Sequence, residues 1–577
     1  MRGDVKLQGT STPVLTGGQA LVQSLKAEGI DTVFGLPGVQ LDWAFDALYA
    51  ERDAIRVYHT RHEQAVSYMA DGYARVAGRV GVCLTVPGPG VLNAMAGLAT
   101  AYACSSPVLC VTGQIPSRDI GAGRGMLHEI NNQLFALRSV TKWATGVLEP
   151  ADIPGTIHEA FRQIHTGRPR PAAVEIPLDV LRGTAGMMPA GPAAVTPVAA
   201  DPETVERAAR VIGRAERPVI FAGGGVLRAA AWEPLRQLAA VLEAPVVMTE
   251  NGKGALSSRH YLAQTMTAAA ELVPAADVVL VVGSRFFLPT RSDWGPRPGQ
   301  TVIQLDVDPE EIGRNCEVSH GIVADAKLGL EALVAAVTRH NRKRTSRRDE
   351  LEAVRTRTRA RFGAVQPQAA FAAAIRDVLP DDGILVTEMT QVGYWCNTGF
   401  PVYKPRTYLT SGYQGTLGHG FANALGAQVG APGRKVVSIN GDGGFMYNVQ
   451  ELSTAVRHRL NVVAIVFSDN AYGNVRRIQR ESFGGRTIAT DLLNPDFVRL
   501  AEAFGMDGVR AETPDALRRT LAQALGNDRP ALIEVPVEEM PDPRTIMRPG
   551  YRGPEGLRSR EGVRARTSPR APYPPRP

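Results

Sequence analysis

Short apolar runs alternate along the chain with longer stretches of helical pattern, and this alternation constrains the fold more than any other feature. The runs are rich in Val and Ile, and the stretches between them are rich in Ala and Leu. Continuous apolar strands separated by helices form parallel sheets that are covered on both faces. We therefore predict an α/β protein built from doubly wound parallel sheets. The clearest predicted strands are residues 80–86, 107–112, 218–221, 278–282, 301–305 and 462–467.

Two seams divide the 577 residues into domains. One seam, residues 184–202, is rich in Pro, Ala and Gly, and the other, residues 338–358, is rich in Arg and Lys. Both compositions are typical of linkers or exposed connecting helices. The first and last blocks end in similar segments, RPRPAAVEIPLDV and DRPALIEVPVEEM, which suggests that they share one α/β design. We predict domains at residues 12–185, 195–340 and 360–540, followed by a tail at residues 541–577.

The formal net charge of +7 does not indicate a nucleic-acid-binding protein, because most of it lies in the tail. Residues 541–577 contain nine Arg and only three acidic residues, which leaves a charge of +1 for the rest of the chain. A nucleic-acid reader carries its basic stripe on the folded body. The tail also contains nine Pro, and we expect it to be a solvated, disordered extension, with a weak tether to an anionic partner as the alternative.

The five Cys residues include no C-x-x-C pair, which fits a reducing, cytoplasmic location and argues against a structural zinc site. The first residues contain no apolar core of a signal peptide. No run approaches the roughly 18 apolar residues that a membrane span requires. The sequence therefore predicts neither secretion nor a membrane partner.

The strongest chemical signal lies in the third predicted domain. A predicted strand runs into Gly441-Asp442-Gly443-Gly444, and a helix is expected from about Val449. The next predicted strand ends at Asp469-Asn470, so Asp442 and Asn470 are expected side by side at the carboxyl edge of a parallel sheet. Two hard oxygens suit Mg²⁺, and the glycines let the backbone approach a phosphate closely.

This stretch resembles the diphosphate–magnesium motif of thiamine diphosphate enzymes, in which G-D-G is followed some thirty residues later by N. The usual Asn-Asn pair is here Asp469-Asn470, and the second residue is the ligand in the family. The resemblance implies Mg²⁺ ligands at Asp442, Asn470 and the backbone carbonyl of Tyr472. It also implies coenzyme contacts at Gly441, Gly443, Gly444 and Gly473.

The first predicted domain contains the matching half of the resemblance. Arg61-His62-Glu63-Gln64-Ala65 is similar to the R-H-E-Q-A segment of the family, in which the carboxyl group promotes the imino tautomer of the coenzyme's aminopyrimidine ring. The turn at residues 88–93 resembles G-P-G-x-x-N, which implies that Pro89 and Asn93 face the pyrimidine. The turn at residues 112–116 looks like T-G-Q-x-P.

A second turn of the third domain, residues 411–418, resembles the S-G-x-x-G-T-M-G turn that grips the pyrimidine. The resemblance implies that the Gly412 carbonyl accepts from the exocyclic amine and that Leu417 props the coenzyme in its bent shape. Leu417 replaces a Met, which conserves side-chain volume. The family shares each coenzyme between two subunits, so a homodimer or homotetramer is expected.

The motifs cover about residues 14–540 and resemble the acetolactate synthase-like branch, but several positions depart from it. Where that branch has F-Q-E, this chain has Leu127-His128-Glu129, and His128 is a candidate acid or base on the substrate side, or else a loop residue without a role. Glu388 and His419 also replace the usual residues and join the candidates.

The middle domain contains Phe221-Ala222-Gly223-Gly224-Gly225 after a strand, which a plain strand-to-helix turn explains as well as a dinucleotide site does. Residues 251–255 resemble the family's G-K-G turn. Residues 262–271 lack the glycines that the synthase places against its flavin. This segment argues against a bound FAD, which stays an open alternative.

The sequence therefore predicts an enzyme that decarboxylates a small 2-oxo acid with thiamine diphosphate and Mg²⁺ and joins the product to a second carbonyl, as acetolactate synthase does. One alternative is a non-ligating decarboxylase or lyase of the same superfamily, acting on a 2-oxo acid, an acyl-CoA or a sulfonate. A nicotinamide-dependent oxidoreductase using Gly223–Gly225 is the alternative from another class, and a catalytically silent binding protein is a third.

Overall fold

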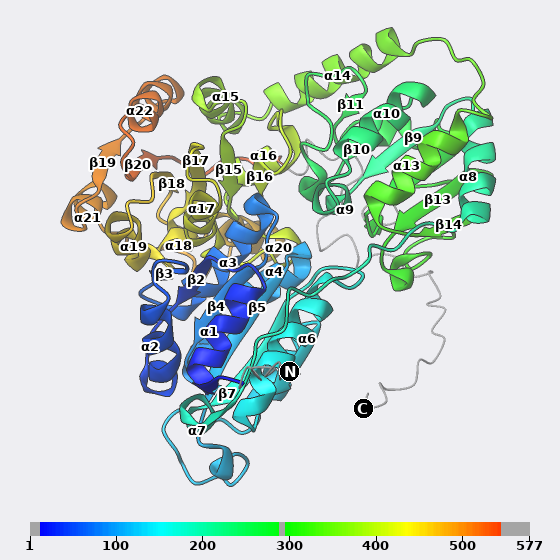
Figure 1. Ribbon diagram of the computed structural model, residues 1–577. Helices are drawn as coiled ribbons and strands as arrows, with labels where there is room; N and C mark the ends of the chain where they lie inside the picture. Colours follow the sequence, from blue (N-terminus) through cyan, green and yellow to red (C-terminus); the bar gives the residue numbers. More distant parts are fainter. Residues whose placement is uncertain (1–11, 288–294, 544–577) are drawn as a thin grey trace, which may run out of the picture.

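The computed structural model describes residues 12–287 and 295–543, and it contains three parallel six-stranded sheets with helices on their faces (Figure 1). The α/β fold class predicted from the alternating pattern is confirmed. Most of the predicted tail, residues 544–577, lies outside the described residues, as do the first eleven residues.

The first sheet has the strand order β3-β2-β4-β5-β7-β6. A short antiparallel pair, β1 (Val14–Thr16) with β8 (Thr184–Gly186), joins the two ends of this domain. The strands are β2 (Thr32–Gly35), β3 (Arg56–His59), β4 (Gly81–Thr85), β5 (Val108–Gln114), β6 (Trp143–Gly146) and β7 (Ala172–Pro177). The helices are α1 (Gly17–Ala27), α2 (Asp42–Ala50), α3 (Glu63–Ala77), α4 (Pro89–Cys104), α5 (Gln133–Arg138), α6 (Ile153–His165) and α7 (Leu178–Arg182).

The middle sheet has a different order, β11-β10-β9-β12-β13-β14, in which its first strand in the chain, β9, lies third, between β10 and β12. Its strands are β9 (Val219–Ala222), β10 (Val246–Met248), β11 (Ala263–Gln264), β12 (Val278–Val282), β13 (Thr301–Asp306) and β14 (His320–Val323). The helices are α8 (Pro202–Arg214), α9 (Gly224–Arg228), α10 (Trp232–Leu242), α11 (Ala269–Leu272) and α13 (Ala326–Val337). The Arg-rich second seam contains an exposed connecting helix, α14 (Arg348–Gly363), which leads to the third domain.

The third sheet has the order β16-β15-β17-β18-β20-β19, which repeats the order of the first sheet strand for strand. The shared design that the two similar segments suggested is therefore confirmed, because those segments form β7 and β20 at equivalent places. The strands are β15 (Ile384–Thr387), β16 (Tyr408–Leu409), β17 (Val436–Gly441), β18 (Val462–Ser468), β19 (Asp507–Arg510) and β20 (Ala531–Pro536). The helices are α15 (Gln368–Val378), α16 (Gln391–Gly399), α17 (His419–Gly430), α18 (Asp442–Phe445), α19 (Leu452–Arg457), α20 (Gly473–Ser482), α21 (Phe497–Ala503) and α22 (Pro514–Gly526).

Helices α3 and α17 pack against each other between the first and third domains (Figure 1). Their backbones approach so closely that a Cβ on Gly72 would lie 2.1 Å from the Asn423 carbonyl oxygen, and one on Gly426 would lie 2.0 Å from that of Met69. Buried apolar side chains of both domains form one continuous core around this crossing. The middle domain has a core of its own. The first and third domains of one chain are therefore fixed to each other as a unit.

Candidate functional site

The carboxyl group of Glu63 lies at the start of α3, directly after the edge strand β3. His62 caps the helix, and its Nδ1 accepts from the Gln64 amide at 3.1 Å. Glu63 is 9% exposed, and the Asn93 side-chain amide donates to its Oε2 at 3.0 Å. Asn93 belongs to α4, whose first residue is Pro89. The structure thus brings together three residues that the sequence placed at one site.

The turn before α4 depends on Gly88, whose φ of +58° lies in the left-handed region that a side chain rarely adopts. A Cβ on Gly88 would also lie 2.3 Å from the His128 carbonyl oxygen, so His128 belongs to this edge of the sheet. The ring Nδ1 of His128 lies 3.1 Å from Gln40 Oε1. The candidate histidine is therefore held beside the Glu63 half of the site, and its chemical role stays a prediction.

Two glutamines that the sequence analysis missed organise this region. Gln133 accepts from the Gly88 amide at 2.8 Å and donates to the Gly113 carbonyl at 3.0 Å, so it joins two predicted turns. Gln40 donates to the Leu127 carbonyl at 3.2 Å and contacts His128. The Gly/Pro turn at residues 35–38, just after a strand, is the local signal that points to Gln40.

Asp442 and Asn470 lie side by side at the carboxyl edge of the third sheet, as predicted. Asp442 follows β17 and is 2% exposed, and its Oδ2 accepts from the Asn470 backbone amide at 2.8 Å. Burial raises the pKa of the Asp442 carboxyl, and the hydrogen bonds to it act in the opposite direction. The predicted helix from about Val449 is confirmed, because a helical turn at Val449–Glu451 continues into α19, and a further short helix, α18, already begins at Asp442 itself.

A side-chain amide bridges these two residues. Asn494 Nδ2 donates to Asp442 Oδ2 at 2.7 Å and to Asn470 Oδ1 at 3.0 Å, which places a donor where both oxygens converge. The Tyr472 carbonyl caps α20 and accepts from the Arg476 amide at 2.9 Å, which leaves it a second lone pair. A carboxylate, an amide oxygen and a carbonyl are hard donors that fit Mg²⁺. Among residues 12–287 and 295–543, no group of three His, Cys, Asp or Glu offers a rival metal site.

The turn at residues 411–418 belongs to the third domain and packs against α4 of the first. Gly412 has a φ of +60° and lies against Cys104 of α4, and Leu417 is half-buried. The amide of Gly418 donates to Glu388 Oε1 at 2.5 Å, and its carbonyl accepts from Asn448 at 2.7 Å. The Thr416 and Thr100 hydroxyls lie 3.0 Å apart. The turn is therefore anchored on both domains of its own chain.

Three domain families match the chain in the order of its three sheets. The thiamine pyrophosphate enzyme N-terminal TPP binding domain matches residues 15–135, the central domain residues 205–333, and the C-terminal TPP binding domain residues 388–535. The chain belongs to the thiamine pyrophosphate enzyme family. This assignment argues against the hypothesis that Gly223–Gly225 belong to a nicotinamide-dependent oxidoreductase.

Relatives of the enzyme match it over almost its whole length. A probable acetolactate synthase large subunit of Methanocaldococcus jannaschii is 35% identical, over 91% of this chain and 93% of that protein. The acetolactate synthase isozyme 3 large subunit of Escherichia coli is 32% identical, over 91% and 95%. A probable 2-ketoarginine decarboxylase of Pseudomonas aeruginosa is 34% identical, over 90% and 94%. The resemblance to the acetolactate synthase-like branch is confirmed.

Glu388 and His419 of this thiamine pyrophosphate enzyme are buried beneath the site instead of facing its surface. Burial raises the pKa of Glu388 to about 8, and its Oε2 has no hydrogen-bond partner among the described residues. Burial, with Arg75 nearby, lowers the pKa of His419 to about 3. The His419 ring packs edge-on to Tyr68, with centroids 5.8 Å apart. At neutral pH His419 is therefore an uncharged core residue.

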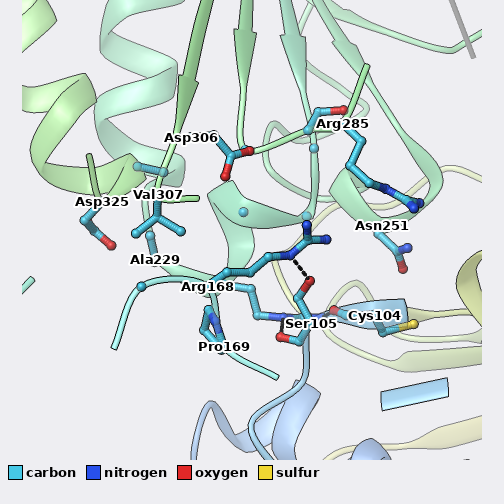
Figure 2. Close-up of a pocket in the computed structure, with 18 of the residues that line it drawn as sticks. Cys104, Ser105, Arg168, Pro169, Ala229, Asn251, Arg285, Asp306, Val307 and Asp325 are labelled. Carbon is cyan, nitrogen blue, oxygen red and sulfur yellow. Dashed lines mark hydrogen bonds between the residues drawn. The ribbon is translucent and has the colours of Figure 1, made fainter. Parts of the chain in front are cut away.

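The carboxyl edge of the enzyme's middle sheet opens into a cavity of about 720 Å³, which reaches the first and third domains (Figure 2). Gly223–Gly225 line one wall. Arg168 and Arg285 extend into the region, and Arg168 donates to the Ser105 hydroxyl at 2.9 Å. Burial raises the pKa of Asp306, at the end of β13, to about 6. This cavity is separate from the Asp442 cluster and carries its own cationic groups.

Proposed function

We propose that this enzyme decarboxylates a small 2-oxo acid and joins the resulting unit to a second carbonyl, in the manner of acetolactate synthase. The observation that carries the proposal is the pair of clusters, Glu63 with Asn93 and Asp442 with Asn470, on two sheets of identical strand order. The similarity to acetolactate synthase subunits over more than nine-tenths of their length supports the same reaction class.

Thiamine diphosphate supplies the electron sink that 2-oxo acid decarboxylation requires. Glu63 would exchange a proton with the pyrimidine ring nitrogen, and the bond from Asn93 to Oε2 directs the free Oε1 toward that partner. Asp442, Asn470 and the Tyr472 carbonyl would hold Mg²⁺. The glycines at 441, 443, 444 and 473 would leave room for the diphosphate, and Gly412 and Leu417 would position the pyrimidine.

A substrate screen tests this proposal. The purified protein is incubated with thiamine diphosphate, Mg²⁺ and a panel of 2-oxo acids, and CO₂ and organic products are measured by mass spectrometry. We expect CO₂ together with a 2-hydroxy-2-alkyl-3-oxo acid, and acetolactate when pyruvate is the only substrate. An absence of CO₂ release with every acid, under conditions in which the coenzyme binds, would contradict the proposal.

The second candidate is a non-ligating decarboxylase. It is favoured by the 34% identity to a probable 2-ketoarginine decarboxylase, which equals that of two synthase relatives. The same screen separates the two, because a simple decarboxylase yields CO₂ and an aldehyde without a coupled product. A panel that includes cationic and branched 2-oxo acids therefore identifies the substrate class.

We also propose that two subunits complete each site, as a homodimer or homotetramer. In the described part of one chain, no hydrogen bond joins the Glu63 cluster to the Asp442 cluster. Large apolar side chains are exposed beside each cluster: Leu127 is 64% and Phe135 72% exposed near the first, and Ile488 is 79% and Leu493 101% exposed near the second. Such side chains suit a subunit interface. Light scattering of the purified protein gives the subunit number.

Two further parts of the proposal concern location and flavin. No described helix has the length and apolarity to cross a membrane, and all five cysteines are free thiols. The free thiols support the cytoplasmic location expected from the sequence. We propose that the enzyme works without FAD, because residues 262–271 lack the glycines expected against a flavin. A flavin absorbance band in the freshly purified protein would overturn this, and the cavity of the middle domain would be its site.

A further inference from the structure

A groove far from the middle-domain cavity lies between the first and third domains. Its walls come from α2 and β3 of the first domain and from the turn that follows α19 in the third. The hollow has a volume of about 660 Å³. Four arginines line it, Arg52, Arg56, Arg457 and Arg459, and we name it the arginine groove after them. No carboxylate side chain lines it.

These arginines differ from most exposed arginines of the molecule in having no counter-charge. Across the described residues, no carboxylate oxygen lies within 4.0 Å of their guanidinium nitrogens. Elsewhere, Arg236 pairs with Glu233 and Arg357 with Glu271, each at 2.6 Å. Asp31 influences Arg56 only at longer range, because its own carboxylate pairs with Arg79 at 2.7 Å. The groove therefore keeps an uncompensated positive charge.

Two histidines beside the arginine groove are affected by its positive charge. The rings of His59 and His458 lie 4.9 Å apart, and His458 Nε2 lies 3.3 Å from the His59 carbonyl oxygen. Burial lowers the pKa of His458 to about 4, and His59 and Arg457 lower it further. Burial also lowers the pKa of His59, with Arg457 and Arg61 acting in the same direction. An additional positive charge is disfavoured here, so an anion would be attracted.

We propose that the arginine groove binds a compact polyphosphate anion, such as inorganic tripolyphosphate or the phosphates of a nucleotide. Planar guanidinium groups form paired hydrogen bonds with phosphate oxygens, and four of them around one hollow match a small anion of several charges. An acidic peptide is the less favoured occupant, because the four arginines line a single hollow of limited volume. The apolar floor includes Leu48 and Ile55, which are buried.

Because of the position of the groove, a bound anion would have two effects on the protein. It would add a contact between the first and third domains at β3, and Glu63 follows the last residue of that strand by only four positions. It would also relieve the repulsion on His59 and His458 and raise the pKa of both. Binding should therefore take up protons, so affinity should rise as the pH falls from the ordinary histidine pKa of 6.5 toward the lowered pKa of His458, about 4.

Calorimetric titration of the holoenzyme with tripolyphosphate tests the proposal. The protein is first saturated with thiamine diphosphate and Mg²⁺ and then desalted, so that the diphosphate site is filled. We expect saturable binding at low ionic strength that weakens with added salt. The double variant Arg457→Gln/Arg459→Gln should weaken it at least 10-fold. The matched control Arg236→Gln/Arg357→Gln removes the same charge from other surfaces and should bind normally.

The outcomes separate the possible sources and occupants. If tripolyphosphate and ADP bind alike, the phosphates alone are recognised; if only ADP binds, the nucleoside contributes. Equal weakening in both double variants, or no saturable binding, would overturn the proposal. Competition by a hexaglutamate peptide at lower concentration than tripolyphosphate would overturn the choice of occupant. The experiment measures binding and not decarboxylase activity, so its result can be interpreted even if the proposed function is wrong.

Discussion

The third strand of the first sheet, β4, runs into Gly88 and Pro89, whereas the third strand of the last sheet, β17, runs into Asp442. Because the two sheets share one strand order, these turns occupy equivalent places at the carboxyl edge. The first turn carries no charge and faces the carboxyl of Glu63 from the neighbouring helix. The second turn carries the carboxylate itself. With the roles proposed for these residues, the same fold serves as a proton-handling edge in the first sheet and as a cation-holding edge in the last.

The sixth strand of each sheet, in chain order, shows the same kind of difference between equivalent positions. Glu175 of β7 and Glu534 of β20 hold equivalent places, and each faces a different partner. Glu175 accepts from the Gln133 and Gln114 amides, at 3.1 and 3.2 Å. Glu534 accepts from Arg510 on the adjacent strand, at 2.8 Å. One carboxyl is buried among neutral amides and the other is paired with a cation.

The largest effect is expected at the proton-handling edge. Glu63→Gln removes the exchangeable carboxyl and should slow exchange of the coenzyme C2 proton by about 10²- to 10⁴-fold, the range of general acid–base catalysis. Hydrogen–deuterium exchange followed by NMR of the bound coenzyme measures this rate directly. Asn93→Ala, which leaves the carboxyl but frees its Oε2, should cost about 10-fold or less. Unchanged exchange in Glu63→Gln would remove this residue from the site.

The next largest effect is expected at the cation-holding edge. Asp442→Asn removes the negative ligand and should weaken the affinity for Mg²⁺ by at least the roughly 10- to 100-fold that loss of a residue supporting the metal ligands costs. Intrinsic fluorescence, titrated with Mg²⁺ at fixed thiamine diphosphate, gives the affinity. The matched control is Asp469→Asn, which removes a neighbouring carboxyl that is not a proposed ligand and restores an Asn-Asn pair. Equal losses in both variants would reject the assignment of Asp442 as the ligand.

Residues at strand ends were predictable from the sequence, because an apolar run marks the strand and glycines mark the turn after it. Asp442 and Asn470 were found in this way. Residues that arrive from loops were not, and Asn494 is an example. Asn494 follows Asn470 by 24 residues, and no periodic pattern encodes the path that brings its amide to 3.0 Å from Asn470 Oδ1. Local patterns fix the sheet edges, whereas loop paths depend on tertiary packing.

A moderate effect is expected at His128, which has no counterpart at the cation-holding edge. If the ring takes part in proton transfer to the substrate, His128→Asn should lower kcat by about 100-fold while leaving the affinity for thiamine diphosphate unchanged. Steady-state kinetics over a pH series and a coenzyme titration separate these quantities. His260→Asn, in the middle domain, is the matched control. A variant with normal kcat would mean that His128 serves only to hold its loop through Gln40.

The smallest effect is expected inside the sheets, at Glu175 and Glu534. Burial raises the pKa of Glu175, so its folded-state pKa lies above the unfolded value. The protonated form is therefore favoured in the folded protein, and this contribution to stability is lost as the pH rises through the folded-state pKa. Glu175→Gln should be as stable as the parent near pH 4 and more stable by about 1 kcal/mol near pH 8.

Glu534→Gln should lower the stability of the protein, because it removes the ion pair with Arg510. The Arg510 side chain is 43% exposed, so solvent screening limits the loss at neutral pH to about 0.5–1 kcal/mol. Thermal unfolding of both variants and the parent at two pH values measures the contrast. A stabilising Glu175→Gln beside a destabilising Glu534→Gln at pH 8 would confirm that equivalent carboxyls serve opposite electrostatic roles. A loss of stability in Glu175→Gln at pH 8 would show that hydrogen bonds from the two glutamines outweigh the cost of burying its charge.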